Sequence, residues 1–153
     1  MNEIYNIAPA STKPLIFISI FGMLMIFILG LFCYIVYSSR HTTFKISGQG
    51  LSIRGTLYGR MIPTGAFIPE EARQVNLRSD SMLRLRRRGN GIGLPGYQAG
   101  WFRLSNGDKA LVFVTDPSRA VYLPTRKGYA LLLSVERPEA FLQSFQRMIS
   151  NLG

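Results

Sequence analysis

Residues 100–115, GWFRLSNGDKALVFVT, carry the clearest strand pattern in this chain. The segments GWFRL (100–104) and KALVFVT (109–115) are rich in aromatic and aliphatic residues that pack well on a pleated sheet. Between them, SNGD (105–108) contains residues that tight turns prefer. The stretch therefore predicts a β-hairpin, and with it a mainly β domain.

Short segments of the same kind continue on both sides of this hairpin. They are TFKIS (43–47), GLSIR (50–54), VNLRS (75–79), MLRLR (82–86), AVYLPT (120–125) and YALLLSV (129–135). Turn residues separate many of them, at the spacing that is typical of small barrels and sandwiches. The pattern predicts about seven strands in a small barrel or sandwich.

The last part of the chain changes to a helical period. In RPEAFLQSFQRMISNLG (137–153), the apolar residues recur at steps that place them on one face of a helix. We expect an amphipathic helix over 138–150, with its apolar face on the open end of the barrel. A helix lying on a membrane would carry more cations than Arg137 and Arg147 on its polar face.

Residues 15–37, LIFISIFGMLMIFILGLFCYIVY, contain no charged residue. A helix of this length reaches about 35 Å, enough to cross a hydrocarbon core of about 30 Å. A buried core helix rarely stays apolar around its whole circumference, and a cleaved signal peptide has a shorter apolar core. The sequence therefore predicts a short tail (1–14), a transmembrane helix (15–37) and a β domain (38–153).

Charge is concentrated after the apolar run. Of 18 basic and 8 acidic residues, one of each precedes it, which leaves 17 and 7 for residues 38–153, a net charge of +10. Such an excess favours anionic partners, among them lipid headgroups and nucleic acid. Arg40 and Lys45 follow the run closely, whereas only Lys13 precedes it. The positive-inside rule therefore predicts a single-pass protein of the cell membrane with a cytoplasmic C-terminal domain.

The segment GIGLPG (91–96) matches the Gly-x-Gly-x-x-Gly pattern of dinucleotide-binding proteins. That chemistry needs a helix directly after the glycines, because the helix N-terminus receives the pyrophosphate. Here YQAGWFRL (97–104) follows and alternates like a strand. The match therefore does not predict a nucleotide site, and we expect the glycines to serve close backbone approach and positive φ in a long loop.

Three segments resemble the bacterial pleckstrin-homology-like (PH-like) domain family. They are GIGLPGYQAGWFRL (91–104), GDKALVFVTDPSRAVYLPT (107–125) and YALLLSVERPEAFLQSF (129–145). The resemblance implies a partly open seven-stranded barrel, capped by the C-terminal helix and often found beside a membrane span. The expected fold is thus one N-terminal transmembrane helix followed by a PH-like β-barrel. The family has no general enzymatic activity, so the resemblance implies a binding or scaffolding module.

No catalytic or metal-binding pattern stands out in the sequence. The only histidine is His41, and the only cysteine, Cys33, lies inside the apolar run. Asp80, Asp108 and Asp116 occur in turn-like contexts, where carboxylates usually accept backbone N–H groups. We therefore expect no enzymatic activity, no metal site and no cofactor.

The candidate ligand-binding residues are basic and come from two places. The first group is the run Arg84, Arg86, Arg87 and Arg88, next to the glycine segment. On a regular strand Arg84, Arg86 and Arg88 would share one face, where guanidinium groups can bind phosphate. The second group is Lys45 and Arg54, which are similar in position to basic residues of phosphoinositide-binding PH domains. Gly55 and Thr56 follow Arg54, so that motif is incomplete and inositol-phosphate recognition is not implied.

Four readings of the basic run remain open. It can be a solvated face, a site for anionic lipid headgroups, or a site for an acidic protein partner. Nucleic acid is disfavoured because few aromatic residues are interleaved with the cations, and Trp101 and Phe102 are explained at least as well as core residues. The alternative to a binding module is a structural subunit of a multi-protein membrane complex.

Overall fold

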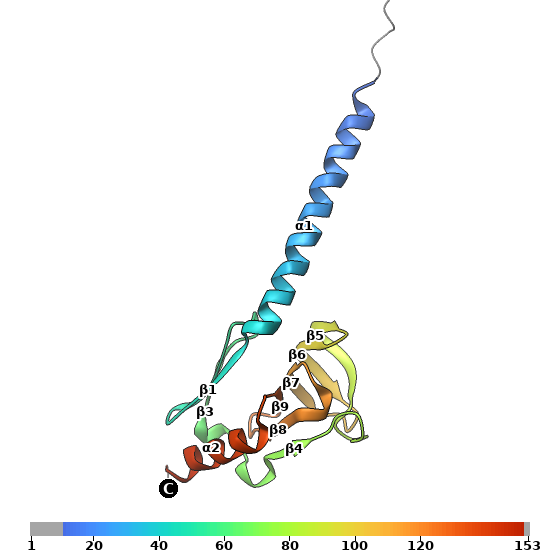
Figure 1. Cartoon of the computed structure of the whole chain (residues 1–153). Coiled ribbons are helices and arrows are strands. Elements are labelled where there is room, and N and C mark those ends of the chain that lie inside the picture. The colour runs from blue at the N-terminus through green and yellow to red at the C-terminus, as the bar shows by residue number, and fades with distance from the viewer. Residues whose placement is uncertain (1–10, 152–153) are drawn as a thin grey trace, which may run out of the picture. The chain divides into compact units, whose positions relative to one another are not determined.

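The computed structural model describes residues 11–151 and begins with the long helix α1 (Lys13–His41) (Figure 1). Its apolar side chains are exposed on all sides, and its most apolar window has a mean hydropathy of 2.8 with no buried residue. α1 is therefore long and apolar enough to cross a membrane. It extends beyond the apolar run 15–37 at both ends, because the flanking polar residues are also helical.

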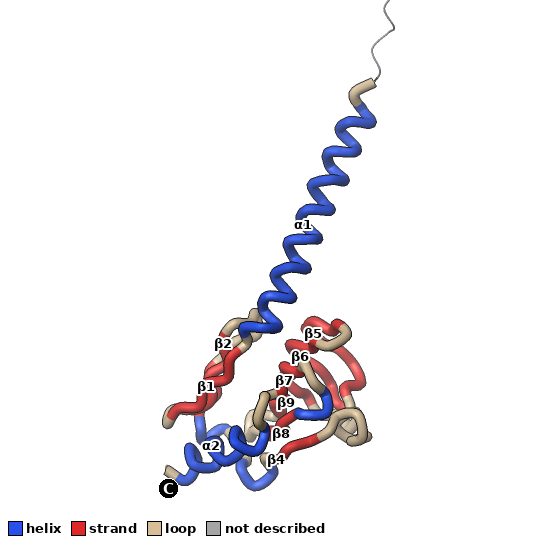
Figure 2. Tube along the Cα trace, viewed as in Figure 1, coloured by secondary structure: helices blue, strands red, loops and turns tan. Residues whose placement is uncertain are grey.

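The chain divides into two compact units after Ser38, and the second unit contains two β-sheets (Figure 2). The smaller sheet is antiparallel and has the order β1 (Thr43–Ser47), β2 (Gly50–Arg54), β3 (Met61–Pro63). The larger sheet has the order β4–β8–β9–β7–β6–β5 and is antiparallel except for the parallel pair β7 and β9. Its strands are β4 (Arg73–Val75), β5 (Leu85–Leu94), β6 (Tyr97–Leu104), β7 (Lys109–Val114), β8 (Ala120–Pro124) and β9 (Ala130–Ser134).

Helical segments complete the domain. Short 3-10 helices connect the strands at η1 (Thr64–Ala66), η2 (Pro69–Glu71) and η3 (Pro117–Arg119). The predicted C-terminal amphipathic helix is present as α2 (Pro138–Ser150), which packs against β1, β4 and β8. The predicted hairpin is also confirmed, since β6 and β7 pair over Gln98–Arg103 and Lys109–Val114.

Within residues 39–151 the strands number nine, more than the about seven that the sequence predicts. β3 and β4 are three residues long, too short to show an alternating pattern. The larger sheet does not close into a barrel, because its two edge strands, β4 and β5, do not pair with each other. The fold is therefore an open arrangement of two sheets and a helix, and not a closed barrel.

The strands predicted at residues 75–79 and 82–86 are largely wrong, because turns and bends occupy residues 76–84. The apolar residues that suggested strands, Leu77 and Leu83, are instead buried against the larger sheet. Asp80 fixes this segment by accepting hydrogen bonds from the backbone N–H groups of Met82 (2.9 Å) and Leu83 (3.0 Å). Periodicity alone does not separate an anchored turn from a short strand.

The core lies on both faces of the larger sheet. Val112 and Leu132 are fully buried on one face, and their strand neighbours on the other face are equally buried. α2 contributes Phe145, whose ring meets the ring of Phe67 edge to face at 5.1 Å. All the buried apolar side chains among the described residues come from Leu51 onward, so the domain core needs no side chain of α1.

We expect Ser134→Ala to lower the free energy of unfolding of residues 39–153 by about 2 kcal/mol. Ser134 Oγ donates a hydrogen bond to the Asp116 carbonyl (2.8 Å) and accepts one from the Asp116 N–H (3.2 Å). Denaturant unfolding measures the change. Ser79→Ala is the control, because its exposed hydroxyl makes one long hydrogen bond (3.3 Å), and an equal loss there would contradict this role for Ser134.

Candidate anion-binding groove

The glycine segment forms a hairpin between β5 and β6, and the predicted long loop is wrong. Leu94 pairs with Tyr97 across a tight turn at Pro95 and Gly96, where Gly96 has φ +76°. The predicted close backbone approach is present, because Gly91 pairs with Gly100 in adjacent strands. β6, not a helix, follows Gly96, so the geometry that a dinucleotide site requires is absent from this part of the chain.

The pairing of β5 with β6 is irregular, with register shifts between Leu85 and Arg87 and between Arg88 and Gly91. Extra residues in β5 interrupt the alternation of side chains. Arg88 is opposite Phe102 and therefore lies on the same face as that buried ring, as does Leu85. A regular strand would place Arg84, Arg86 and Arg88 on one face. The register shift between Leu85 and Arg87 breaks this alternation, so the prediction of a shared face is wrong.

A groove of about 420 Å³ crosses this edge of the larger sheet. Its lining, which we call the basic groove, consists of Arg87, Arg88, Gly89, Trp101, Phe102, Arg103 and Lys109. Four of these residues are cationic and none is acidic. β5, β6 and the start of β7 therefore bring together charges that are far apart in sequence.

Trp101 is the centre of the groove's polar contacts. The Arg60 guanidinium carbon lies 4.9 Å from the centre of the Trp101 ring, and Lys109 Nζ lies 4.5 Å from it. The ring of Tyr129 meets Trp101 edge to face at 5.1 Å. Two cations are thus held at one indole, an arrangement that is favourable for each cation alone but brings like charges together.

The positive charge of the groove is not neutralised by the domain itself. Among the described residues the one ion pair joins Arg119 and Asp116 (3.8 Å), and it is remote in sequence from the groove cations. Arg103 Nη1 donates a hydrogen bond to the Gly107 carbonyl (3.0 Å), which orients it without cancelling its charge. The groove can therefore offer several N–H donors to one anionic group.

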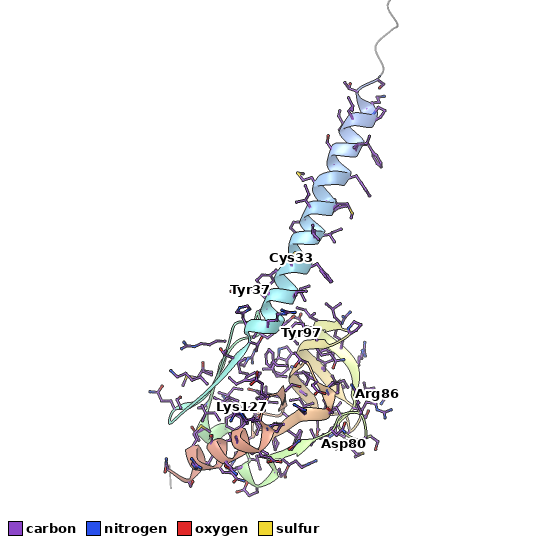
Figure 3. All side chains as sticks on the ribbon, viewed as in Figure 1. Cys33, Tyr37, Asp80, Arg86, Tyr97 and Lys127 are labelled. Carbon is purple, nitrogen blue, oxygen red and sulfur yellow. The ribbon has the colours of Figure 1, made fainter. Side chains whose placement is uncertain are left out.

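The remaining predicted site residues do not line the groove. Arg84 and Arg86 are exposed beside it, and Figure 3 shows Arg86 directed outward from the sheet. Lys45 and Arg54 are in the smaller sheet, at diagonal positions on the polar face of the β1–β2 hairpin. Of the predicted site residues, the structure thus brings only Arg87 and Arg88 into the groove. Arg84 and Arg86 lie beside it, and Lys45 and Arg54 are in the other sheet.

Sequence reasoning missed several residues that line the groove, and also Arg60, which contacts Trp101 from outside that lining. Trp101 and Arg103 flank the buried Phe102 in β6, so their side chains lie on the opposite face of the strand. The alternation of residues in GWFRL could have indicated this shared face. Arg60 had no such signal. It reaches Trp101 because the β2–β3 loop folds toward β5 and β6, where the Tyr58 hydroxyl donates to Asn90 Oδ1 (3.3 Å).

The acidic residues of the turns serve the backbone. Asp116 Oδ1 accepts hydrogen bonds from the Ser118 hydroxyl (2.6 Å) and N–H (2.9 Å). These bonds, led by the one from the hydroxyl, hold the pKa of the Asp116 carboxyl below its usual value. In residues 11–151 no three His, Cys, Asp or Glu side chains gather as a metal site would need.

The comparisons with known proteins agree with this architecture. The sequence profile of the family described as "Bacterial PH domain" matches residues 42–149. No curated protein and no solved structure matches the chain. The matched range takes in both sheets and nearly all of α2, which is most of the chain. The chain therefore belongs to the bacterial PH domain family.

Proposed function

We propose that this protein is a membrane-anchored, non-enzymatic binding module whose PH domain holds anionic lipid headgroups in the basic groove. PH domains are generally non-catalytic modules that bind lipids or proteins. The observation that carries the proposal is Trp101, with Arg60 and Lys109 held over its ring beside a groove whose lining has no acidic residue. A site of this kind accommodates an anion.

A phosphate-bearing headgroup suits the groove best. A guanidinium group can bind two phosphate oxygens at once, and three arginines, Arg87, Arg88 and Arg103, line the groove. Indole rings favour the headgroup level of a bilayer, and Trp101 is only partly buried. Anchoring by α1 raises the effective concentration of the domain at the bilayer, so contacts worth about 1 kcal/mol per cation are sufficient.

The proposed location of the domain is the cytoplasmic side of the cell membrane. Arg40 and Lys45 follow the apolar run closely, whereas only Lys13 precedes it. The positive-inside rule favours a cytoplasmic position for the flank that carries more Lys and Arg. We expect a C-terminal tag to resist protease in spheroplasts and to be digested after the cells are opened. Digestion in intact spheroplasts would contradict this orientation.

Flotation tests headgroup binding directly. We expect residues 39–153 to float with vesicles of phosphatidylcholine and phosphatidylglycerol, and not with phosphatidylcholine alone. Binding should weaken as the Debye length falls from about 10 Å at 0.1 M salt to about 3 Å at 1 M. No flotation, together with stoichiometric co-purification of an acidic membrane protein from mild detergent, would contradict the lipid proposal. It would favour a protein partner or a subunit role instead.

A further inference from the structure

A small cavity lies between the two sheets, where β1 meets β6, β7 and β9. Its volume is about 140 Å³. Three of the lining residues carry aromatic rings and three carry aliphatic hydroxyl groups: Phe44, Tyr97, Phe113, Thr42, Thr115 and Ser134. None of them is charged, although the domain as a whole has a large excess of cations. Thr115 is the one exposed residue of this lining, so the cavity opens to solvent beside the end of β7.

Tyr97 supplies an independent sign of a missing ligand. Its side chain is only 6% exposed, and its hydroxyl is buried without a hydrogen-bond partner among the described residues. No other buried side-chain oxygen or nitrogen in the described part of the chain lacks a partner. Such a hydroxyl has lost its contacts with water and gained nothing in return, which is unfavourable. It can both donate and accept a hydrogen bond.

The side chain of Tyr97 is directed toward this cavity. Tyr97 is the first residue of β6 (Figure 3), and Ala99, two positions later, is opposite Phe113 in β7. Alternate residues of a strand share a face, so Tyr97 and Phe113 lie on the same face of the larger sheet. The Phe113 ring meets the ring of Phe44 edge to face at 6.2 Å, so this face is turned toward β1. The Tyr97 hydroxyl therefore belongs to the space between the sheets.

We propose that this cavity binds an uncharged aromatic ring that carries a hydroxyl group, as in a phenol. The size fits, because an apolar cavity of about 150 Å³ can hold a benzene ring. The aromatic side chains of the lining favour edge-to-face contact with a ring, and the hydroxyl of the ligand would pair with that of Tyr97. A charged ligand would be buried without a counter-charge, which is costly.

Two other occupants fit the cavity less well. The end of an acyl chain has no polar atom, so it would leave the Tyr97 hydroxyl unpaired. Water needs several polar partners, but the Ser134 hydroxyl is already paired with the backbone carbonyl and N–H of Asp116. The rings of Phe44 and Phe113 offer water no such partner.

Amide NMR titrations of the full-length protein in non-ionic detergent test the site. The probes are phenol, benzene, which has the same ring without the hydroxyl, and benzoate, which is charged. The free concentration of each probe is measured in the same sample, because the detergent takes up part of it. We expect phenol to cause saturable shifts at Phe113 and Thr115 and to bind at least about fivefold more tightly than benzene. Benzoate should cause no saturable shift there.

Tyr97→Phe removes the hydroxyl and keeps the ring. We expect the affinity for phenol to fall at least about fivefold, and the affinity for benzene to stay unchanged. Without a probe, the Tm of Y97F should be no lower than that of the unmodified protein, because the hydroxyl has no partner to lose. Tyr122→Phe is the matched control, since Tyr122 lies on the opposite face of the larger sheet and does not line the cavity. Y122F should bind phenol as the unmodified protein does.

The proposal is overturned if phenol causes no saturable shift at Phe113 and Thr115, or if Y97F binds phenol as tightly as the unmodified protein. It is also overturned if benzoate binds there, if benzene binds as tightly as phenol, or if Y97F lowers the Tm without a probe. A lower Tm would mean that ordered water already pairs with the hydroxyl. No residue of this cavity lines the basic groove, so each of these results leaves headgroup binding untouched.

Discussion

Replacing Arg87, Arg88 and Lys109 with glutamine is expected to weaken binding of residues 39–153 to phosphatidylglycerol vesicles by about 100-fold. Each cation near an anionic surface contributes about 1 kcal/mol, and about 1.4 kcal/mol corresponds to a tenfold change in affinity. These three side chains line one groove and form no ion pair among the described residues, so their loss removes contacts without freeing a buried partner charge. Vesicle partitioning at constant salt measures the affinity.

The matched control removes the same charge from elsewhere on the domain. Arg126, Lys127 and Arg137 are exposed, and none lines the basic groove. Their triple replacement with glutamine keeps the net charge equal to that of the groove variant, and we expect it to retain most of the vesicle affinity. Equal losses in the two triple variants would mean that net charge, and not the groove, carries the binding.

Gly100→Ala is expected to destabilise the domain by about 3–4 kcal/mol, the largest stability effect of a single substitution considered for this fold. Gly100 has φ +114°, and an added Cβ would lie 2.5 Å from the Cα of Gly91 and 2.6 Å from the carbonyl oxygen of Asn90. Both neighbours are backbone atoms of β5, so relief requires the two strands to separate. Denaturant unfolding of residues 39–153 measures the loss.

Gly107→Ala separates backbone strain from steric contact. Gly107 also has a positive φ, +92°, but nothing lies within 4 Å of an added Cβ. We expect this variant to lose only about 1–2 kcal/mol, the cost of the left-handed conformation. If both variants lose the same amount, close packing of β5 on β6 is not what requires glycine at position 100.

The sequence predicted those parts of the fold whose periodicity is uninterrupted. Residues 100–115 contain two runs of strand-forming residues around a strong turn, and the apolar face of α2 repeats at helical steps, so both elements were found. The prolines and glycines of residues 58–72 left open whether β3 would be irregular or an edge strand, and β4 was not found, because three residues contain too little pattern. Residues 76–84 were misassigned because burial of Leu77 and Leu83 is a tertiary effect that has no period.

The candidate site was predicted in part for similar reasons. The arginine run and its place beside the glycines are visible in the sequence, so Arg87 and Arg88 were identified. The face of the sheet on which each arginine lies could not be predicted, because it depends on register shifts that arise when β5 pairs with β6. Arg60 was missed because its contact with Trp101 comes from the path of a loop, which neither composition nor spacing records.

The fluorescence of Trp101 during a vesicle titration tests the central claim most directly, because Trp101 is the only tryptophan of the chain and lies in the basic groove. With residues 39–153 and phosphatidylglycerol-containing vesicles, we expect a saturable shift of its emission that salt reverses and that phosphatidylcholine alone does not cause. Binding of the domain to anionic vesicles with no change in Trp101 emission would place the contact elsewhere and contradict the account.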